Sequence, residues 1–217
     1  MSVIEIIRMP VGQQATNCYL VWEQNTKQGV IVDPGDDATS ITEKISELGL
    51  QIEGIYLTHG HFDHLLGLLE LLLATGAPFY MHPADAFLLT RAQSTAQHFG
   101  FESDPVPTDF VALCAVALPQ TEWKVIETPG HTPGSVCLML TSEVPIFLDG
   151  SELDEHQVLF TGDTLLPEEK TDTSHRYSST KELRASFAKL RDIVGQTVVL
   201  PGHGLPLPLV AYEALLK

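Results

Sequence analysis

Four short turns that carry histidine or aspartate place the strongest constraint on how this chain can fold. Residues 58–64 have the sequence THGHFDH and directly follow the strand-like run 52–57. The turns around His131, Asp163 and His203 also follow β-rich runs, and each contains glycine or proline. Turns of this kind gather at one edge of a sheet, where the ends of distant strands can meet. We therefore expect a sheet-rich fold in which the four turns converge on one site.

The residue types in these turns are those that bind metal ions. Imidazole suits zinc, iron and other first-row transition metals, and carboxylate completes their coordination. One tetrahedral ion needs only four ligands, whereas seven candidates are present, so the set suits two ions that share one carboxylate. The candidate ligands are His59, His61, Asp63, His64, His131, Asp163 and His203.

The spacing within residues 58–64 supports two ions rather than one. His59 and His61 are two residues apart, so at an extended strand end they point the same way and can hold one ion. Asp63 and His64 come after the chain turns into a helix, so they face a different point. The remaining histidines are isolated and are expected to be ordinary surface residues: His82, His98, His156 and His175.

The order of apolar runs predicts a mixed α/β chain. In the first half, strand-like and helix-like segments alternate, which favours an α/β arrangement. The second half is richer in strands. Strands are expected at 18–23, 29–33, 52–57, 79–81, 125–128, 136–140, 158–160 and 198–200. Helices are expected at 39–48, from the histidine motif to about 75, at 84–98 and at 181–194, with exposed loops at 100–110 and 149–156.

Length and charge limit the partners that we expect. The 217 residues suit a single domain over 1–217, and 12 basic against 28 acidic side chains give a formal charge of −16. Such a surface disfavours nucleic acid and membrane surfaces as partners, which leaves a small-molecule substrate. No secretory signal is visible, the apolar stretch 65–77 is too short to span a bilayer, and the 3 cysteines suit a reducing compartment. We expect a soluble, cytoplasmic protein of open oligomeric state.

Four motifs together resemble those of the metallo-β-lactamase superfamily. They are THGHFDH at 58–64, TPGHTPGS at 128–135, FTGDTL at 160–165 and PGHG at 201–204. The second and third are most similar to the glyoxalase II branch, the hydroxyacylglutathione hydrolases, and the opening segments NCYL at 17–20 and VDPG at 32–35 also fit. The resemblance implies an α/β fold of four layers, an αββα sandwich with the metals at one edge of its two sheets.

The resemblance also implies a role for each candidate ligand. The first metal would be held by His59, His61 and His131. The second would be held by Asp63, His64 and His203, and Asp163 would bridge the two. Asp33 matches an acid that supports the site from behind, with a strand-end turn as the alternative. Two divalent ions per chain are implied, with zinc favoured and iron or manganese as alternatives.

The chain departs from glyoxalase II in two places that concern glutathione. It ends 14 residues after His203, without the C-terminal helical region that helps to hold glutathione in that branch. The Gly-Arg-x-Asp segment that usually follows the bridging aspartate is also absent. Lys170 and Arg176 are the nearest basic residues to the Asp163 motif, so they are candidates to hold a substrate carboxylate; the alternative is a solvated loop.

These motifs imply a binuclear metallohydrolase that cleaves a small acyl thioester. A hydroxide between the ions would attack the carbonyl carbon, with Asp63 and Asp163 as the catalytic carboxylates and Asp63 orienting the hydroxide. The alternatives are a mononuclear iron persulfide dioxygenase, whose distinctive stretch after the bridging aspartate is absent, and a lactonase or β-lactamase on the same metals. A phosphodiester nuclease suits the acidic chain poorly. A non-catalytic binding protein on this fold would be expected to have lost ligands, and none is lost here.

Overall fold

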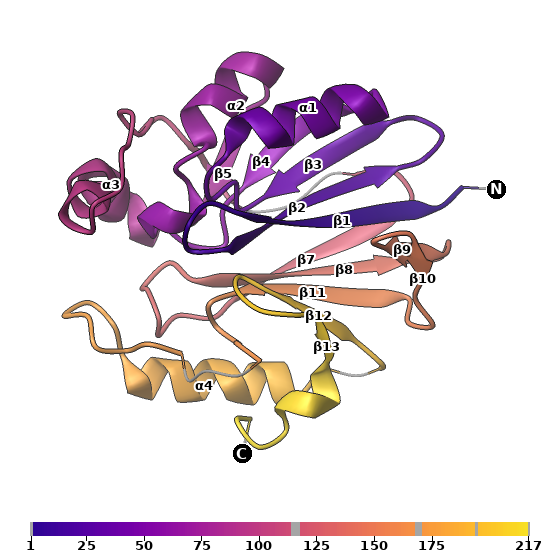
Figure 1. Cartoon of the computed structure of the whole chain (residues 1–217). Coiled ribbons are helices and arrows are strands. Elements are labelled where there is room, and N and C mark those ends of the chain that lie inside the picture. Colours follow the sequence, from indigo (N-terminus) through magenta and orange to yellow (C-terminus); the bar gives the residue numbers. More distant parts are fainter. Residues whose placement is uncertain (1, 114–117, 168–170, 194, 217) are drawn as a thin grey trace.

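The computed structural model describes residues 2–113, 118–167, 171–193 and 195–216. Two β-sheets lie face to face, and helices cover the outer face of each sheet (Figure 1). This is the αββα sandwich expected from the motifs, so the predicted fold class is confirmed. Among the described residues, no helix is long and apolar enough to cross a membrane.

The first sheet has eight strands in the order β10-β9-β1-β2-β3-β4-β5-β6. Strands β1, β2 and β3 pair antiparallel, and β3 to β6 pair parallel. Their bounds are β1 Ile4–Val11, β2 Thr16–Glu23, β3 Gln28–Val32, β4 Gln51–Tyr56, β5 Phe79–Met81, β6 Val111–Ala112, β9 Ile146–Leu148 and β10 Ser151–Glu152.

The second sheet has five strands in the order β13-β12-β11-β8-β7. Only β11 and β12 pair parallel, so both strands end at the same edge of the sheet. The bounds are β7 Thr121–Glu127, β8 Val136–Ser142, β11 Gln157–Gly162, β12 Val198–Pro201 and β13 Leu207–Pro208.

Helices form the two outer layers. Figure 1 shows α1, α2 and α3 on the side of the first sheet and α4 beneath the second. The bounds are α1 Ala38–Leu48, α2 Leu68–Thr75, α3 Ala86–His98 and α4 Thr180–Arg191, with short 3₁₀ turns η1 Phe62–His64, η2 Pro83–Asp85 and η3 Leu209–Tyr212. Helix α1 shows why such segments form: Asp37 caps its start, Ile41 and Ile45 are buried on one face, and Gly49 ends it in the left-handed conformation.

Strand β2 explains how one segment serves two layers of the core. Every residue of β2 is buried, because its side chains alternate between two faces and each face is covered by a core cluster. Leu20 and Trp22 pack in the cluster beneath α1 and α2. Tyr19 and Val21 pack between the sheets, where the Tyr19 ring meets Phe160 of β11 edge-on at 5.2 Å.

The structure differs from the sequence expectations at a few elements. Strand β1 was not predicted; it pairs with β2 along its whole length. The loop expected at 149–156 contains β10, because Asp149 and Gly150 both adopt positive φ and form a tight turn that returns the chain onto β9. Helix α4 ends at Arg191 rather than 194, and the segment 84–98 begins within the 3₁₀ turn η2.

The two sheets are joined at the edge where β4, β11 and β12 end. The Asn17 side chain donates hydrogen bonds to the carbonyl oxygens of Pro201 and Gly204 at 2.9 and 2.8 Å. The Tyr19 hydroxyl donates a hydrogen bond to the Pro201 carbonyl at 2.7 Å, and the backbone amide of Asn17 donates one to the Gly202 carbonyl at 2.7 Å. These contacts hold the start of β2 against the end of β12 and set the spacing between the sheets at this edge.

Replacing Gly162 by alanine should destabilise the protein more than replacing Gly49. Both glycines have positive φ, so each substitution carries left-handed strain of about 1 kcal/mol. A Cβ at Gly162 would also collide with the Thr58 hydroxyl, whereas nothing lies near one at Gly49. Urea unfolding of metal-free protein should therefore show a loss of about 3 kcal/mol for Gly162→Ala and about 1 kcal/mol for Gly49→Ala. Equal losses would contradict this account.

Candidate metal centre

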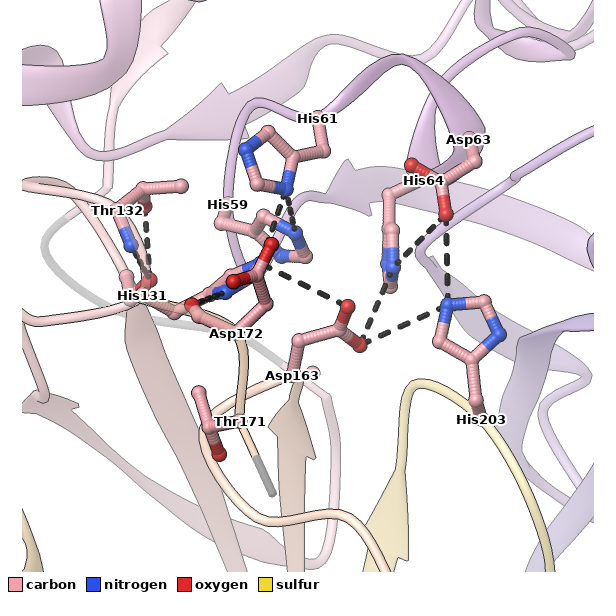
Figure 2. A network of polar contacts seen from close by, with 12 residues as sticks. His59, His61, Asp63, His64, His131, Thr132, Asp163, Thr171, Asp172 and His203 are labelled. Carbon is pink, nitrogen blue, oxygen red and sulfur yellow. Dashed lines mark hydrogen bonds and ion pairs between the residues drawn. The ribbon is translucent and has the colours of Figure 1, made fainter. Parts of the chain in front are cut away.

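The fold brings all seven candidate ligands together at the joined edge of the two sheets. The loop after β4 and the turn η1 supply four of them, from His59 to His64. The β7–β8 loop supplies His131, the end of β11 supplies Asp163, and the end of β12 supplies His203. Figure 2 shows these side chains pointing toward one another across the gap between the sheets.

Three imidazoles form a first candidate group. The His61 Nδ1 atom lies 3.2 Å from His59 Nε2 and 2.9 Å from His131 Nε2. His59 and His131 are almost fully buried. Three nitrogen atoms of this chemistry that face a common point suit one cation.

Asp63, His64 and His203 form a second candidate group. The Asp63 Oδ2 atom lies 3.4 Å from His203 Nε2 and 3.9 Å from His64 Nε2. Asp163 stands between the two groups: its Oδ2 faces His131 Nε2 at 3.6 Å, and its Oδ1 faces His64 and His203 at 3.4 and 3.7 Å (Figure 2). The two oxygens of one carboxylate therefore point at different groups, as a bridge requires.

The unsatisfied atoms of the site test whether metal ions fit it. The Nε2 atom of His64 and the Oδ1 atom of Asp163 are buried without a hydrogen-bond partner in the described part of the chain. Buried polar atoms are almost always satisfied, so these need a partner that the chain itself does not supply. Divalent ions would satisfy them, and the donor set of imidazole and carboxylate suits zinc, iron or manganese.

Each candidate histidine is held in place through the ring nitrogen that points away from the candidate metal position. Such outer contacts fix the ring orientation and its tautomer, and metal-ligating histidines almost always have them. The contacts are His59 Nδ1 to Thr58 Oγ1 at 3.1 Å, His61 Nε2 to the Tyr177 hydroxyl at 2.8 Å, His64 Nδ1 to Asp33 Oδ2 at 3.1 Å, His131 Nδ1 to the Asp172 carbonyl at 2.8 Å and His203 Nδ1 to the Gln14 carbonyl at 3.2 Å.

Asp33 occupies the place behind the site that the resemblance implies. Its carboxylate accepts hydrogen bonds from the Thr58 amide at 2.8 Å and the Thr58 hydroxyl at 2.7 Å, and it also faces His64. Asp33 has a φ of 51°, a left-handed conformation that costs free energy in a residue with a side chain. The strained backbone aims one carboxylate at both Thr58 and His64.

The two candidate groups differ in the protonation of their histidines. Burial, reinforced by the neighbouring imidazoles, lowers the pKa of His59 well below its usual range, and burial with His131 lowers the pKa of His61 to about 3. Burial also acts to lower the pKa of His64, but the carboxylates of Asp163 and Asp33 outweigh it and raise that pKa well above 6.5. Without metal, the first two imidazoles are therefore neutral at pH 7, while His64 is charged.

A cavity of about 640 Å³ opens over the candidate ligands. Asp63, His131, Asp163 and His203 line it on the side of the candidate centre. The rest of the described lining mixes apolar and polar residues: Gln14, Leu166, Pro167, Asp172, Gly204 and Leu205. A small substrate can thus reach both candidate groups from one side.

Of the two candidate substrate residues, only Arg176 lies in the described part of the chain. The Arg176 side chain is exposed and is not among the described residues that line the cavity. Lys170 lies outside the described residues, next to Thr171. Both therefore stay predictions.

Three contributions to the site were not predicted from sequence. Tyr177 lies in a segment without helical or strand periodicity, so no pattern marks it. Gln14 acts through its backbone carbonyl, which any residue could supply. Asp85 is fully buried and bonds two of the ligand loops, yet it is a single acid in a turn whose partners are distant in sequence.

Removing single ligands should empty the groups selectively. We expect about two ions per wild-type chain, about one in His59→Ala or His131→Ala, and less in Asp163→Ala because that carboxylate faces both groups. Elemental analysis of metal-replete protein measures this. His98→Ala, which removes an exposed imidazole, is the control and should keep the wild-type content. Equal content in all variants would refute the ligand assignment.

Metal binding to the second group should release more protons than binding to the first. A histidine must be neutral to bind metal, and the raised pKa of His64 means that it carries a proton at pH 7. Affinity at this group should therefore rise with pH until the pKa of His64 is passed. Calorimetry at pH 7 in buffers of different ionisation enthalpy should show more protons released on metal binding by His59→Ala, which keeps the second group, than by His203→Ala. Equal release would contradict the assignment.

Comparisons with known proteins agree with the geometry. Residues 11–143 match the family model of the metallo-beta-lactamase superfamily. An uncharacterized protein of Aquifex aeolicus is 30% identical over 205 residues, covering 93% of this chain and 89% of the relative. The hydroxyacylglutathione hydrolase GloC of Haemophilus influenzae is 29% identical over 207 residues, covering 93% and 90% of the two chains.

A solved structure extends the likeness to the arrangement of the whole chain. The crystal structure of TTHA1623 in a di-iron-bound form superposes with a TM-score of 0.78 at 27% identity, covering 95% of this chain and 96% of that one. From its motifs, its fold and the family model that covers residues 11–143, the chain belongs to the metallo-beta-lactamase superfamily.

Proposed function

We propose that this metal-dependent hydrolase cleaves a small acyl thioester of the hydroxyacylglutathione type, using two divalent ions. One observation carries the proposal: two adjoining donor groups, with Asp163 between them, lie at the floor of a cavity of about 640 Å³. His59, His61 and His131 would hold one ion and Asp63, His64 and His203 the other, and Asp163 would bridge both. When bound, such ions polarise a carbonyl group and lower the pKa of bound water to about 7.

Asp63 is suited to orient the attacking water. It lines the cavity, and its Oδ2 atom is engaged by the imidazole of His203 at 3.4 Å. Burial acts to raise the pKa of Asp63, but its contact with His203 and the charge of His64 outweigh burial and lower that pKa. The carboxylate therefore stays ionised at neutral pH and can accept a hydrogen bond from water. Asp163 keeps the two donor groups adjacent.

The cavity favours a substrate with a good leaving group. Among the described lining residues, the titratable side chains are four candidate ligands and Asp172, whose side chain is 53% exposed. The Tyr177 hydroxyl is engaged with His61. No described side chain is thus free to protonate a poor leaving group in a dry environment. A thiolate leaves without such help, whereas the amine of a β-lactam and the alkoxide of a phosphodiester are poorer leaving groups that gain more from protonation. The similarity to GloC supports the same choice.

The charge of the chain and the lining of the cavity bear on the thiol carrier. The formal charge of −16 disfavours polyanionic substrates and supports a small molecule. No lysine or arginine is found among the described lining residues, so the carrier half of a glutathione thioester would be held weakly; Lys170 and Arg176 are the candidates to hold its carboxylates. Zinc is the proposed metal, with iron supported by the similarity to the di-iron form of TTHA1623.

Kinetics on a panel of substrates should favour thioesters. At saturating metal, kcat/KM for S-lactoylglutathione or a simpler acyl thioester should exceed that for a lactone, a β-lactam and a phosphodiester by at least about tenfold, since the thiolate is the best of these leaving groups. KM for S-lactoylglutathione should be high and should rise further in Lys170→Ala and Arg176→Ala, with kcat little changed if those contacts act equally in ground and transition states.

Two outcomes would count against the proposal in different ways. Faster turnover of a β-lactam or phosphodiester than of every thioester would overturn the proposed substrate class. Unchanged KM in both basic variants would assign Lys170 and Arg176 to solvent, while leaving the thioester chemistry standing. Lys189→Ala is the matched control, because Lys189 bonds the Glu127 carbonyl and lies outside the lining of this cavity.

A further inference from the structure

Asp85 is a buried carboxylate that belongs to neither donor group. It accepts hydrogen bonds from both loops that carry the first donor group, His59, His61 and His131. It ends the turn η2 between β5 and α3 and is fully buried. Its Oδ2 atom accepts hydrogen bonds from the Gly60 amide at 2.9 Å and the Thr132 hydroxyl at 2.7 Å. Its Oδ1 atom accepts from the Gly134 amide at 2.7 Å. All three donors come from loops of the candidate metal centre.

The positions of these donors in the chain connect Asp85 to the first group alone. Gly60 lies between His59 and His61, and Thr132 directly follows His131. Every histidine of the first group is therefore the chain neighbour of a residue that Asp85 binds. The hydrogen bonds and ion pairs described for Asp85 include none to Asp63, His64 or His203.

Two glycines allow Asp85 to approach this closely. A Cβ at Gly134 would lie 2.7 Å from Asp85 Cγ and 2.8 Å from its Oδ1 atom. One at Gly60 would lie 3.1 Å from Asp85 Cβ. The first distance is too short for a real side chain, and the second is tight. Gly60 and Gly134 thus leave room for Asp85 beside both loops.

The element that carries Asp85 is itself held rigidly. The Asp85 amide donates to the His82 carbonyl at 3.1 Å, and the His82 ring caps the turn by accepting from the Ala84 amide at 3.2 Å. In α3, Leu88 and Leu89 are buried against the core. A carboxylate on this support fixes the distance between the two loops, which belong to different sheets.

Burying a carboxylate is costly unless hydrogen bonds satisfy it, and here three donors do so. We propose that Asp85 is a positioning residue that sets the approach of His131 to His59 and His61 and so the metal affinity of the first group. This inference rests on the ligand assignment proposed above.

Asp85→Asn tests the proposal with little change in volume. All three neighbours donate, so the amide of an asparagine must place its NH₂ group against another donor. The variant is combined with His203→Ala, which leaves the first group, and separately with His59→Ala, which leaves the second. Cobalt(II) titration, followed by the visible absorption of the bound ion, reports both affinity and ligand geometry.

The expected result differs between the two backgrounds. With the first group alone, Asp85→Asn should weaken cobalt binding about 10- to 100-fold and alter the absorption spectrum, as loss of an outer contact commonly does. With the second group alone, affinity should change by less than about twofold. Thr132→Val removes a single donor and should weaken the first group by about fivefold, which keeps the test available if Asp85→Asn folds poorly.

Glu23→Gln is the matched control for stability. Glu23 is also a buried carboxylate that accepts backbone hydrogen bonds, from Thr26 and Asn25, but it lies at the far end of β2. The Glu23→Gln variant should lower the melting temperature without changing the affinity of either donor group for cobalt. Equal weakening of both groups by Asp85→Asn, or unchanged affinity at the first group, would overturn the positioning role while the metal centre stands. Absence of cobalt binding by wild-type protein would overturn the ligand assignment and this inference together.

Discussion

The joint between the two sheets is the contact on which the candidate centre depends. Asn17 and Tyr19, both on β2, donate hydrogen bonds to the Pro201 carbonyl at the end of β12. These hydrogen bonds fix the distance between the two sheets along this edge. Each donor group draws histidines from both sheets: His131 and His203 come from the second, and their partners come from the loop after β4. An error of an ångström in the docking of the sheets would therefore separate the members of both groups at once.

Within this frame, charge rather than geometry distinguishes the two groups. His64 lies between the carboxylates of Asp33 and Asp163, which raise its pKa, whereas His59 is surrounded by imidazoles that add to the effect of burial and lower its pKa. In the metal-free protein a proton on His64 balances the carboxylates of the second group. The first group holds no such counter-charge, and the hydrogen bonds of its outer contacts keep its rings in place instead.

The sequence predicts the parts of this structure that depend on local pattern. The periodic spacing of apolar residues marks most strands and helices, and the motif at 58–64 carries four candidate ligands whose clustering has no packing purpose. Asp85 and Tyr177 escape prediction because their roles exist only in the folded chain, where residues far apart in sequence become neighbours. Strand β10 is missed because it has two residues and owes its existence to the turn at Asp149 and Gly150.

The division of each donor group between two sheets has a consequence for folding as well as for chemistry. An ion held by residues of both sheets acts as a cross-link between the halves of the sandwich, and its binding free energy adds to the free energy that keeps them docked. The supply of metal would then govern the stability of the fold as well as the activity. A chain made where metal is scarce would unfold more readily, because its two sheets would lack this cross-link at the edge where the cavity opens.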